Sequence, residues 1–325
     1  GGVSAVQQAQ MATQTGDNVK VCAVRGNFDD AQTGVKQVFA ACKGRDLHGA
    51  MLSSANSINI GRLAPQVVYY FRAYGDLVKA GRIALGDKVN FVVPTGNFGD
   101  ILAGYFAKEM GLPVGRLVCA SNANDVLTEF ISTGRYDRRR PFYKTVSPSM
   151  DILVSSNLER LLYLLSGDDK LIADLMKQLS ENGEYEVPAD MLEKLHELFW
   201  AGFCDDEGAK TAIGKVWKDD HYLCDTHTAV AWDVAQQYKQ ANPEHNAVVV
   251  LSTASPYKFP AAVLEGIGEK AEGDEFDVME QLHKVTGVPV PKNLADLRSR
   301  AVRHRDVIDR GEMLDYVLGK AAAEK

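Results

Sequence analysis

Cysteine is scarce in this sequence, with five residues in a chain of 325, and no two of them have the Cys-x-x-Cys spacing of a zinc cage. An odd number also argues against a disulfide framework, so we expect reduced thiols. No apolar run approaches the roughly 20 residues that a helix needs to cross a bilayer. The first ten residues have neither the basic start nor the apolar middle of a signal peptide. These absences predict a cytoplasmic protein with no membrane partner.

Positive charge is also in short supply. Lysine and arginine number 36 against 43 aspartates and glutamates, which gives a net charge of -7. A chain of this sign is not drawn to nucleic acid, so we expect no nucleic-acid partner, and any anion site must be built locally. The 46% of hydrophobic residues is enough for one large or two ordinary domains.

The clearest structural signal is a strand, a glycine-rich turn, a helix and a second strand in succession. An apolar run at 89–93 ends in Pro-Thr-Gly-Asn-Phe-Gly-Asp at 94–100, apolar residues then repeat at helical spacing as far as Gly111, and a second apolar run occupies 116–120. This order is typical of the βαβ unit of a parallel sheet. It predicts an α/β fold with an open, mostly parallel twisted sheet and flanking helices.

Weaker signals extend this pattern along the chain. A β-branched run at 18–24 leads into a helical pattern, and a helix over 226–238 precedes an apolar strand at 247–251. Between about 155 and 220 the pattern is mostly helical and polar, which predicts a helical insertion. The tail at 294–318 is predicted to be helical and charged.

The turn after the first apolar strand is a candidate phosphate site. Gly96, Asn97, Phe98 and Gly99 lead directly into a helix, where uncommitted backbone N–H groups lie beside the positive end of the helix dipole. Two glycines alone are more typical of a tight βα turn without a ligand. On these residues alone both interpretations stay open.

Two further segments place polar groups where anions are commonly bound. Ser252 and Thr253 follow the apolar strand at its carboxyl end, where open parallel sheets bind ligands, although a plain helix cap is the alternative. The other segment combines amides, a hydroxyl and a guanidinium at the start of a helix, suited to gripping a dianion or simply to capping. Its residues are Asn56, Ser57, Asn59 and Arg62.

Two polar clusters carry less weight. The arginines at 135 and 138–140 are more typical of a solvated loop than of an anion site. His221 and His227 flank Cys224 and Asp225, but their spacing fits no common zinc pattern, so no metal site is predicted.

Eight strings together resemble the threonine synthase family, in the family's order and over nearly the whole chain. The strings are Gly1-Gly2-Val3-Ser4, Arg25-Gly26-Asn27-Phe28-Asp29-Asp30, Ser54-Ala55-Asn56-Ser57-Ile58-Asn59, Pro94 to Asp100, Asn124-Asp125-Val126-Leu127, Ser147 to Ile152 with Ser155-Ser156-Asn157, Asp225-Thr226-His227-Thr228-Ala229, and Thr253-Ala254-Ser255-Pro256. The family belongs to the tryptophan synthase β-like, fold type II enzymes that use pyridoxal 5'-phosphate (PLP).

The resemblance implies a cofactor site and a substrate site. The backbone at 96–99 would cradle the PLP phosphate, Asp100 belongs to the same string, and the Thr253 hydroxyl would bond the pyridine nitrogen. The residues that bind the substrate phosphate in this family correspond to Asn56, Ser57, Asn59 and Arg62.

The resemblance also implies a reaction. It is the conversion of O-phospho-L-homoserine and water to L-threonine and phosphate by γ-elimination and β-addition, the last step of threonine biosynthesis. In the family, the lysine that holds PLP as a Schiff base precedes the string that here opens the chain, and no lysine here has a matching context. We therefore expect the catalytic lysine upstream, an inactive fragment as printed, and a complementing N-terminal segment as a partner.

The resemblance predicts two domains: residues 1–52 as the remnant of a smaller cofactor-covering α/β domain, and 53–325 as the large PLP-phosphate-binding domain with its insertion at about 155–220. Two other functions stay open. One is a non-catalytic binding module of the PLP fold, favoured by the missing lysine motif; the other is an unrelated α/β enzyme of a phosphorylated metabolite, such as a phosphosugar isomerase. Threonine deaminase and cysteine synthase fit the turn and the insertion less well.

Overall fold

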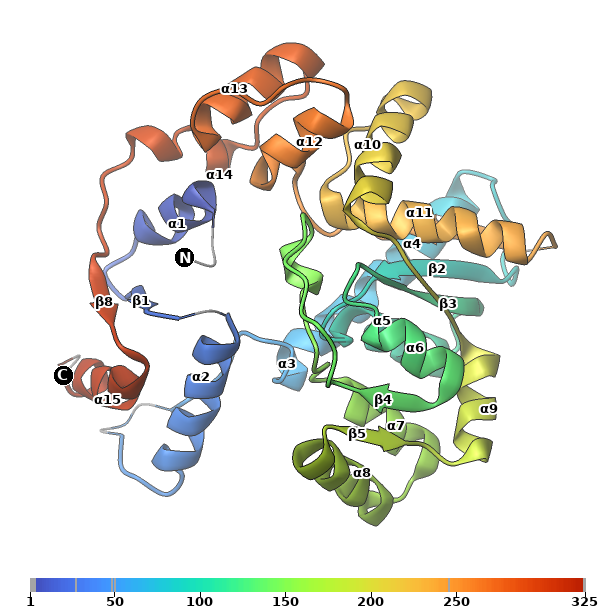
Figure 1. Cartoon of the computed structure of the whole chain (residues 1–325), viewed down its shortest axis with the longest axis horizontal. Helices are drawn as coiled ribbons and strands as arrows, with labels where there is room; N and C mark the ends of the chain where they lie inside the picture. The colour runs from blue at the N-terminus through green and yellow to red at the C-terminus, as the bar shows by residue number, and fades with distance from the viewer. Residues whose placement is uncertain (1–3, 27, 48, 50, 245, 324–325) are drawn as a thin grey trace. The chain divides into compact units, whose positions relative to one another are not determined.

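The chain forms two compact units. The computed structural model describes residues 4–26, 28–47, 49, 51–244 and 246–323 (Figure 1). The large unit is Ser54–Lys270, and the small unit joins Gly1–Ser53 to Ala271–Lys325. No helix within the described residues is long and apolar enough to span a membrane.

A four-stranded parallel sheet forms the centre of the large unit. Its strands, in spatial order, are β6 (Phe199–Phe203), β3 (Val114–Ser121), β2 (Val89–Pro94) and β7 (Ala247–Val250). Phe91 of β2 lies opposite Leu117 on one side and Val249 on the other. All six residues of β2 are buried, as expected for a parallel strand that is covered on both faces. The predicted βαβ unit is confirmed, because β2 and β3 pair in parallel.

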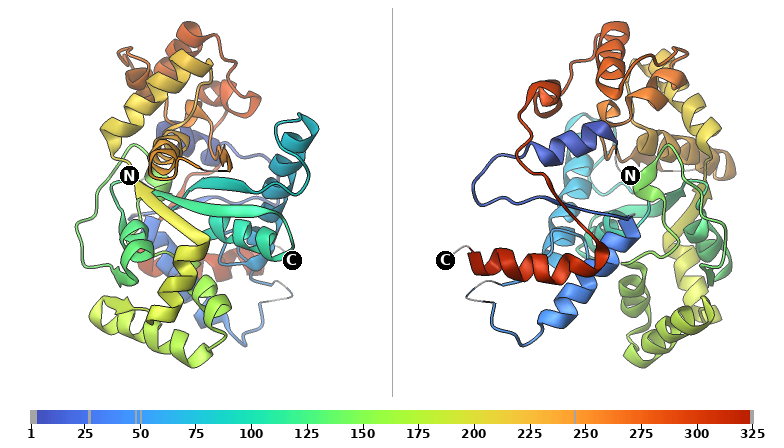
Figure 2. Two further views of the ribbon diagram at one scale, coloured as in Figure 1. Left: turned by 90° about the vertical axis from the view of Figure 1, so that its right-hand side faces the viewer. Right: turned by 60° about the vertical axis from the view of Figure 1, so that its left-hand side comes forward.

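Helices cover both faces of this sheet (Figures 1 and 2). α11 packs on one face, and α5 and α6 pack on the other. Tyr70 extends the core from α4, with its ring edge-on to Phe91 at 5.0 Å. The helices of the large unit are α3 (Ile60–Leu63), α4 (Val67–Lys79), α5 (Gly99–Glu109), α6 (Val126–Thr133), α7 (Leu158–Ser166), α8 (Asp169–Asn182), α9 (Ala189–Leu198), α10 (Asp206–Asp220), α11 (Thr226–Ala241) and α12 (Pro260–Gly266).

The predicted insertion at about 155–220 is helical only in part. It contains α7 to α10, but it also contributes β6 to the central sheet and β5 (Glu184–Glu186), which pairs antiparallel with β4 (Arg135–Asp137). The helical spacing of Leu195 and Leu198 ends at Phe199, whose backbone is extended and pairs with Leu117. The pairing satisfies the backbone groups along the edge of β3, which a helix could not do.

The small unit is built on two short parallel strands, β1 (Cys22–Val24) and β8 (Asp306–Ile308). Val38 and Cys42 of α2 pack against Met313 of α15, and the two helices lie side by side (Figure 2). Its helices are α1 (Ala5–Ala12), α2 (Phe28–Cys42), α13 (Glu275–Thr286), α14 (Lys292–Ala295) and α15 (Met313–Ala323).

Two sequence predictions for the C-terminal part differ from the structure. The prediction that residues 271–325 belong to the large domain is wrong: they belong to the small unit, because β8 pairs with β1 and α15 packs on α2. The tail at 294–318 is not a continuous helix, since it contains β8. Residues 1–3 and Asn27, which belong to two of the family-like strings, lie outside the described residues.

Candidate functional site

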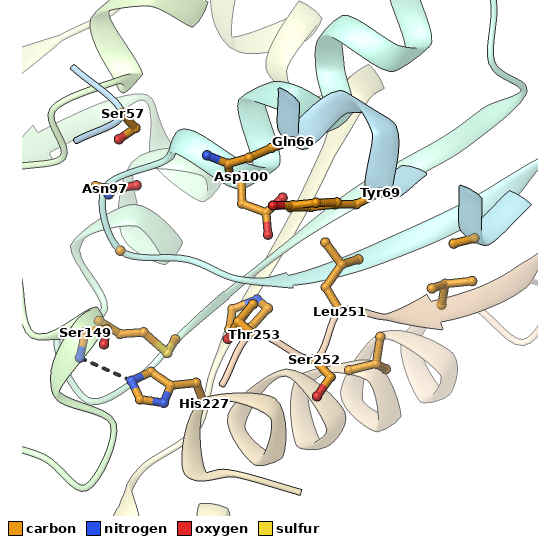
Figure 3. Close-up of a pocket in the computed structure, with 16 residues that line it drawn as sticks. Ser57, Gln66, Tyr69, Asn97, Asp100, Ser149, His227, Leu251, Ser252 and Thr253 are labelled. Atoms are coloured by element: carbon orange, nitrogen blue, oxygen red, sulfur yellow. Dashed lines mark hydrogen bonds between the residues drawn. The ribbon is translucent and has the colours of Figure 1, made fainter. Parts of the chain in front are cut away.

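A pocket of about 610 Å³ lies at the carboxyl ends of β2 and β7 in the large unit. Figure 3 shows Asp100 and Tyr69 on one side of it and Ser149 and His227 on the other, with Thr253 between them. Five of the predicted site residues line the pocket: Ser57, Gly96, Asn97, Asp100 and Thr253. Its other lining residues are Gln66, Tyr69, Ala73, Pro94, Ser149, Met150, His227, Val249, Val250, Leu251 and Ser252.

The turn between β2 and α5 offers backbone donors. The N–H groups of Gly96, Asn97 and Phe98 have no hydrogen-bond partner among the described residues. Phe98 adopts a left-handed backbone conformation, with φ of 64°, and its buried ring packs 5.8 Å from that of Phe199. The side chain of Asn97 accepts the Gly99 N–H at 2.8 Å. Three free donors beside the first turn of an eleven-residue helix suit a phosphate group.

Two glycines of this turn are closely packed against neighbouring segments. A Cβ on Gly96 would lie 2.7 Å from the backbone oxygen of Ser149. A Cβ on Gly99 would lie 3.0 Å from both Cβ and Oγ of Ser57. A side chain at Gly96 would therefore push the turn away from the Ser149 backbone, and one at Gly99 would need Ser57 to shift by a few tenths of an ångström.

The segment before α3 is held mainly by its own side chains. Asn59 caps α3 by accepting the Gly61 N–H at 2.9 Å, and its amide donates to the Ser54 carbonyl at 3.0 Å. The Asn56 Oδ1 accepts the Ile58 N–H at 3.1 Å. Arg62 donates from Nε to the Ala55 carbonyl at 3.0 Å. Of the four predicted substrate-phosphate residues, only Ser57 lines the pocket.

Thr253 is a polar residue that follows β7. Its side chain is exposed in the pocket, and its hydroxyl has no hydrogen-bond partner among the described residues. The neighbouring Ser252 is different, because its Oγ bonds Tyr222 OH at 3.0 Å and accepts from the Thr228 hydroxyl at 3.3 Å. The Thr253 hydroxyl is therefore available to a ligand.

Asp100 is the one acid that lines the pocket within the described residues. The Tyr70 hydroxyl donates to its backbone carbonyl at 2.7 Å and to its Oδ1 at 3.1 Å. Burial raises the pKa of the Asp100 carboxyl to about 6, although the Tyr70 hydrogen bond lowers it in part. A substantial fraction of this carboxyl is therefore protonated near pH 6.

His227 lines the pocket, but both nitrogens of its ring have hydrogen-bond partners. Its Nε2 accepts the backbone N–H of Ser149 at 3.2 Å, and Nδ1 lies 2.9 Å from Oδ1 of Asp225. Since the Ser149 N–H can only donate, Nε2 carries no proton and Nδ1–H donates to Asp225. This arrangement makes His227 a brace for the segment at Ser149. Residue type alone could not reveal this role, because Ser149 is distant in sequence.

Three of the four arginines in the predicted solvated cluster pair with acids, and the fourth, Arg138, donates to the Ser180 carbonyl at 3.1 Å. Arg135 and Arg139 both contact Glu184, and Arg140 bonds Asp125 at 2.7 Å. Within the described residues, no group of three His, Cys, Asp or Glu side chains could hold a metal ion.

Three comparisons relate the chain to known proteins. Residues 228–315 match the sequence family "Threonine synthase, C-terminal". The threonine synthase of Pseudomonas aeruginosa is 40% identical over 306 residues, which are 93% of this chain and 63% of that protein. "Threonine synthase-like 1" of Homo sapiens is 42% identical over 272 residues, which are 82% of this chain and 36% of that protein.

Solved structures agree with these relatives. A PLP-bound threonine synthase from Brucella melitensis superposes with a TM-score of 0.80 at 36% identity. The matched region covers 98% of this chain and 63% of the Brucella melitensis chain. Threonine synthase from yeast gives a TM-score of 0.79 at 32% identity, over 99% of this chain and 63% of its own. The chain therefore spans only part of the length of the proteins it matches.

Proposed function

Since the chain belongs to the threonine synthase family and has the fold type II architecture predicted from its sequence, we propose that it carries the phosphate-binding part of a PLP-dependent threonine synthase. The full-length protein would convert O-phospho-L-homoserine and water to L-threonine and phosphate. One observation carries this proposal. Three free N–H groups after β2 and a free hydroxyl after β7 belong to the turns at one pocket.

The donor set fits PLP. The N–H groups of Gly96, Asn97 and Phe98 would hold its phosphate, and the Thr253 hydroxyl would bond its ring nitrogen. PLP, when bound, supplies an electron sink for charge that develops on the substrate. Because Thr253 is neutral, it holds the ring without fixing a proton on the nitrogen as a carboxylate would. The pocket volume of about 610 Å³ is within the range of small-molecule sites.

A second anion subsite is proposed at Ser57, for the phosphate of O-phosphohomoserine. The Ser57 Oγ accepts a hydrogen bond from Asn157 at 3.0 Å, and its own proton has only a long bond to Asn56 Oδ1, at 3.5 Å, to give up for a phosphate. Asn56 and Arg62 lie in the same segment, and each has donors beyond the bonds that fold the segment. These donors would stabilise charge on the phosphate as it leaves.

The lysine that binds PLP in this family is proposed to come from residues of the full-length protein other than these 325. Among the described residues no lysine lines the pocket. Lys258, five positions after Thr253, is absent from the lining. We also propose that the small unit belongs to the cofactor-covering part of the enzyme.

A second candidate function is a PLP-fold binding module without catalysis. The lack of a pocket lysine among the described residues favours it. It differs from the first in one measurable respect, since it predicts PLP binding without phosphate release from O-phosphohomoserine by the full-length protein.

Replacing Thr253 by valine is expected to weaken PLP binding by about tenfold, because the valine cannot bond the ring nitrogen. A titration followed by PLP absorbance measures this, alongside phosphate release by the full-length protein. Thr253→Ser should retain wild-type affinity. Thr133→Val is the matched control, since Thr133 is exposed at the end of α6 and its hydroxyl bonds local backbone, donating to Glu129 O at 2.8 Å and accepting the Arg135 N–H at 3.1 Å. Equal PLP affinity in Thr253→Val would contradict the assigned role.

A further inference from the structure

Asn157 is a fully buried side chain that joins the two proposed phosphate subsites. Its Nδ2 donates to the Asn97 carbonyl at 2.9 Å and to the Ser57 Oγ at 3.0 Å. Its backbone N–H donates to the same Asn97 carbonyl at 3.1 Å. Asn157, which immediately precedes α7, therefore contacts both the turn after β2 and the segment before α3.

The first contact fixes the direction of a phosphate donor. In a trans peptide the carbonyl of one residue and the N–H of the next point in opposite directions. Two hydrogen bonds on the Asn97 carbonyl therefore aim the free Phe98 N–H away from Asn157. Ser155 acts in the same way one residue earlier, because its hydroxyl donates to the Gly96 carbonyl at 2.9 Å and so aims the Asn97 N–H.

The second contact fixes the direction of the Ser57 proton. Since the Ser57 Oγ accepts from Asn157, its hydrogen must point elsewhere, and the Asn56 Oδ1 acceptor is distant at 3.5 Å. Arg160 supports this geometry from α7. Its Nη1 donates to the Ser57 carbonyl at 2.8 Å and to Asn157 Oδ1 at 2.6 Å, and its Nη2 donates to the Ile58 carbonyl.

We propose that Asn157 is a positioning residue that aims the Phe98 N–H at the cofactor phosphate and the Ser57 hydroxyl at the substrate phosphate. A single side chain thereby sets both subsites relative to each other. This inference rests on the proposed threonine synthase function. It adds a residue for which the sequence indicated no role, although Asn157 stands in one of the family-like strings.

The test uses Asn157→Asp in the full-length protein. Aspartate keeps the shape and the Oδ1 contact with Arg160, but its side chain cannot donate to the Asn97 carbonyl or the Ser57 Oγ, and only the backbone N–H bond to Asn97 remains. We expect the dissociation constant for PLP and the KM for O-phosphohomoserine each to rise by about tenfold, because both subsites lose a positioned donor. A merely structural role would instead lower the melting temperature and the yield of active protein, with both constants unchanged.

Two further variants separate an effect on the cofactor subsite from an effect on the substrate subsite. Ser155→Ala removes only the bond to the Gly96 carbonyl, so it should raise the PLP dissociation constant and leave KM unchanged. Asn182→Asp, at the exposed end of α8, is the matched control and should change neither.

Each outcome of these measurements decides a different claim. Wild-type constants in Asn157→Asp, or in Asn157→Ala if the first variant does not fold, would overturn the positioning role and leave the proposed function intact. A wild-type protein that binds no PLP would overturn the proposed function itself, and the positioning role with it.

Discussion

Gly96→Ala is expected to reduce PLP affinity by about 100-fold or more and to lower the free energy of unfolding by about 2 kcal/mol. The new Cβ would lie 2.7 Å from the Ser149 backbone oxygen and 3.2 Å from the Met150 Cα. These are backbone atoms of a segment that His227 holds, so they cannot rotate away as a side chain can. The turn itself must shift, and its N–H groups would then no longer point at the phosphate. PLP titration and denaturant unfolding measure the two effects.

Gly75→Ala is the control for the loss of a glycine. Gly75 lies within α4, and apart from its two neighbours and the nearby backbone of its own helix, nothing lies within 4 Å of the position that its Cβ would occupy. Alanine there should leave PLP binding unchanged and increase stability by up to about 1 kcal/mol, because it restricts the unfolded chain and favours the helix. If Gly96→Ala bound PLP as tightly as Gly75→Ala, the turn would not be the phosphate site.

Asp100→Asn is expected to stabilise the protein by about 2 kcal/mol at pH 8 and to have little effect near pH 4. Burial raises the pKa of the Asp100 carboxyl from its ordinary value of 3.8 to about 6. The folded state therefore favours the protonated carboxyl, and its stability falls as the pH rises through about 6 and the group ionises. Asparagine stays neutral, and its oxygen can still accept the Tyr70 hydroxyl.

Urea unfolding of both proteins at pH 4 and pH 8 measures this difference. The expected gain allows for the solvent that reaches Asp100 through the pocket. Asp174→Asn, an exposed position on α8, is the control for the substitution itself and should leave the free energy of unfolding nearly unchanged. An equal effect of Asp100→Asn at both pH values would show that ionisation of Asp100 does not destabilise the fold.

The sequence is most informative where one stretch of chain contains a whole structural unit. The run from Val89 to Ala120 predicts the parallel pair β2 and β3 and the turn between them, because apolar periodicity and two glycines are local signals. The prediction fails at Phe199, where an apolar residue continues a helical stripe but the free edge of β3 selects a strand. Pairing with a strand more than 70 residues away leaves no local signal.

The same distinction applies to the site. Gly96, Asn97 and Thr253 are predicted from their place after strands, and the structure brings all three to one pocket. The contacts of Asn157 with Asn97 and Ser57 span 60 and 100 residues. A buried asparagine of this kind can be identified only when its hydrogen-bond partners are known.

The most direct test of the central claim is a crystal structure of the full-length protein with PLP. We expect the PLP phosphate oxygens to lie about 3 Å from the backbone nitrogens of Gly96, Asn97 and Phe98, with the ring nitrogen at hydrogen-bond distance from the Thr253 hydroxyl. PLP bound elsewhere, with these N–H groups and this hydroxyl still without partners, would contradict the claim.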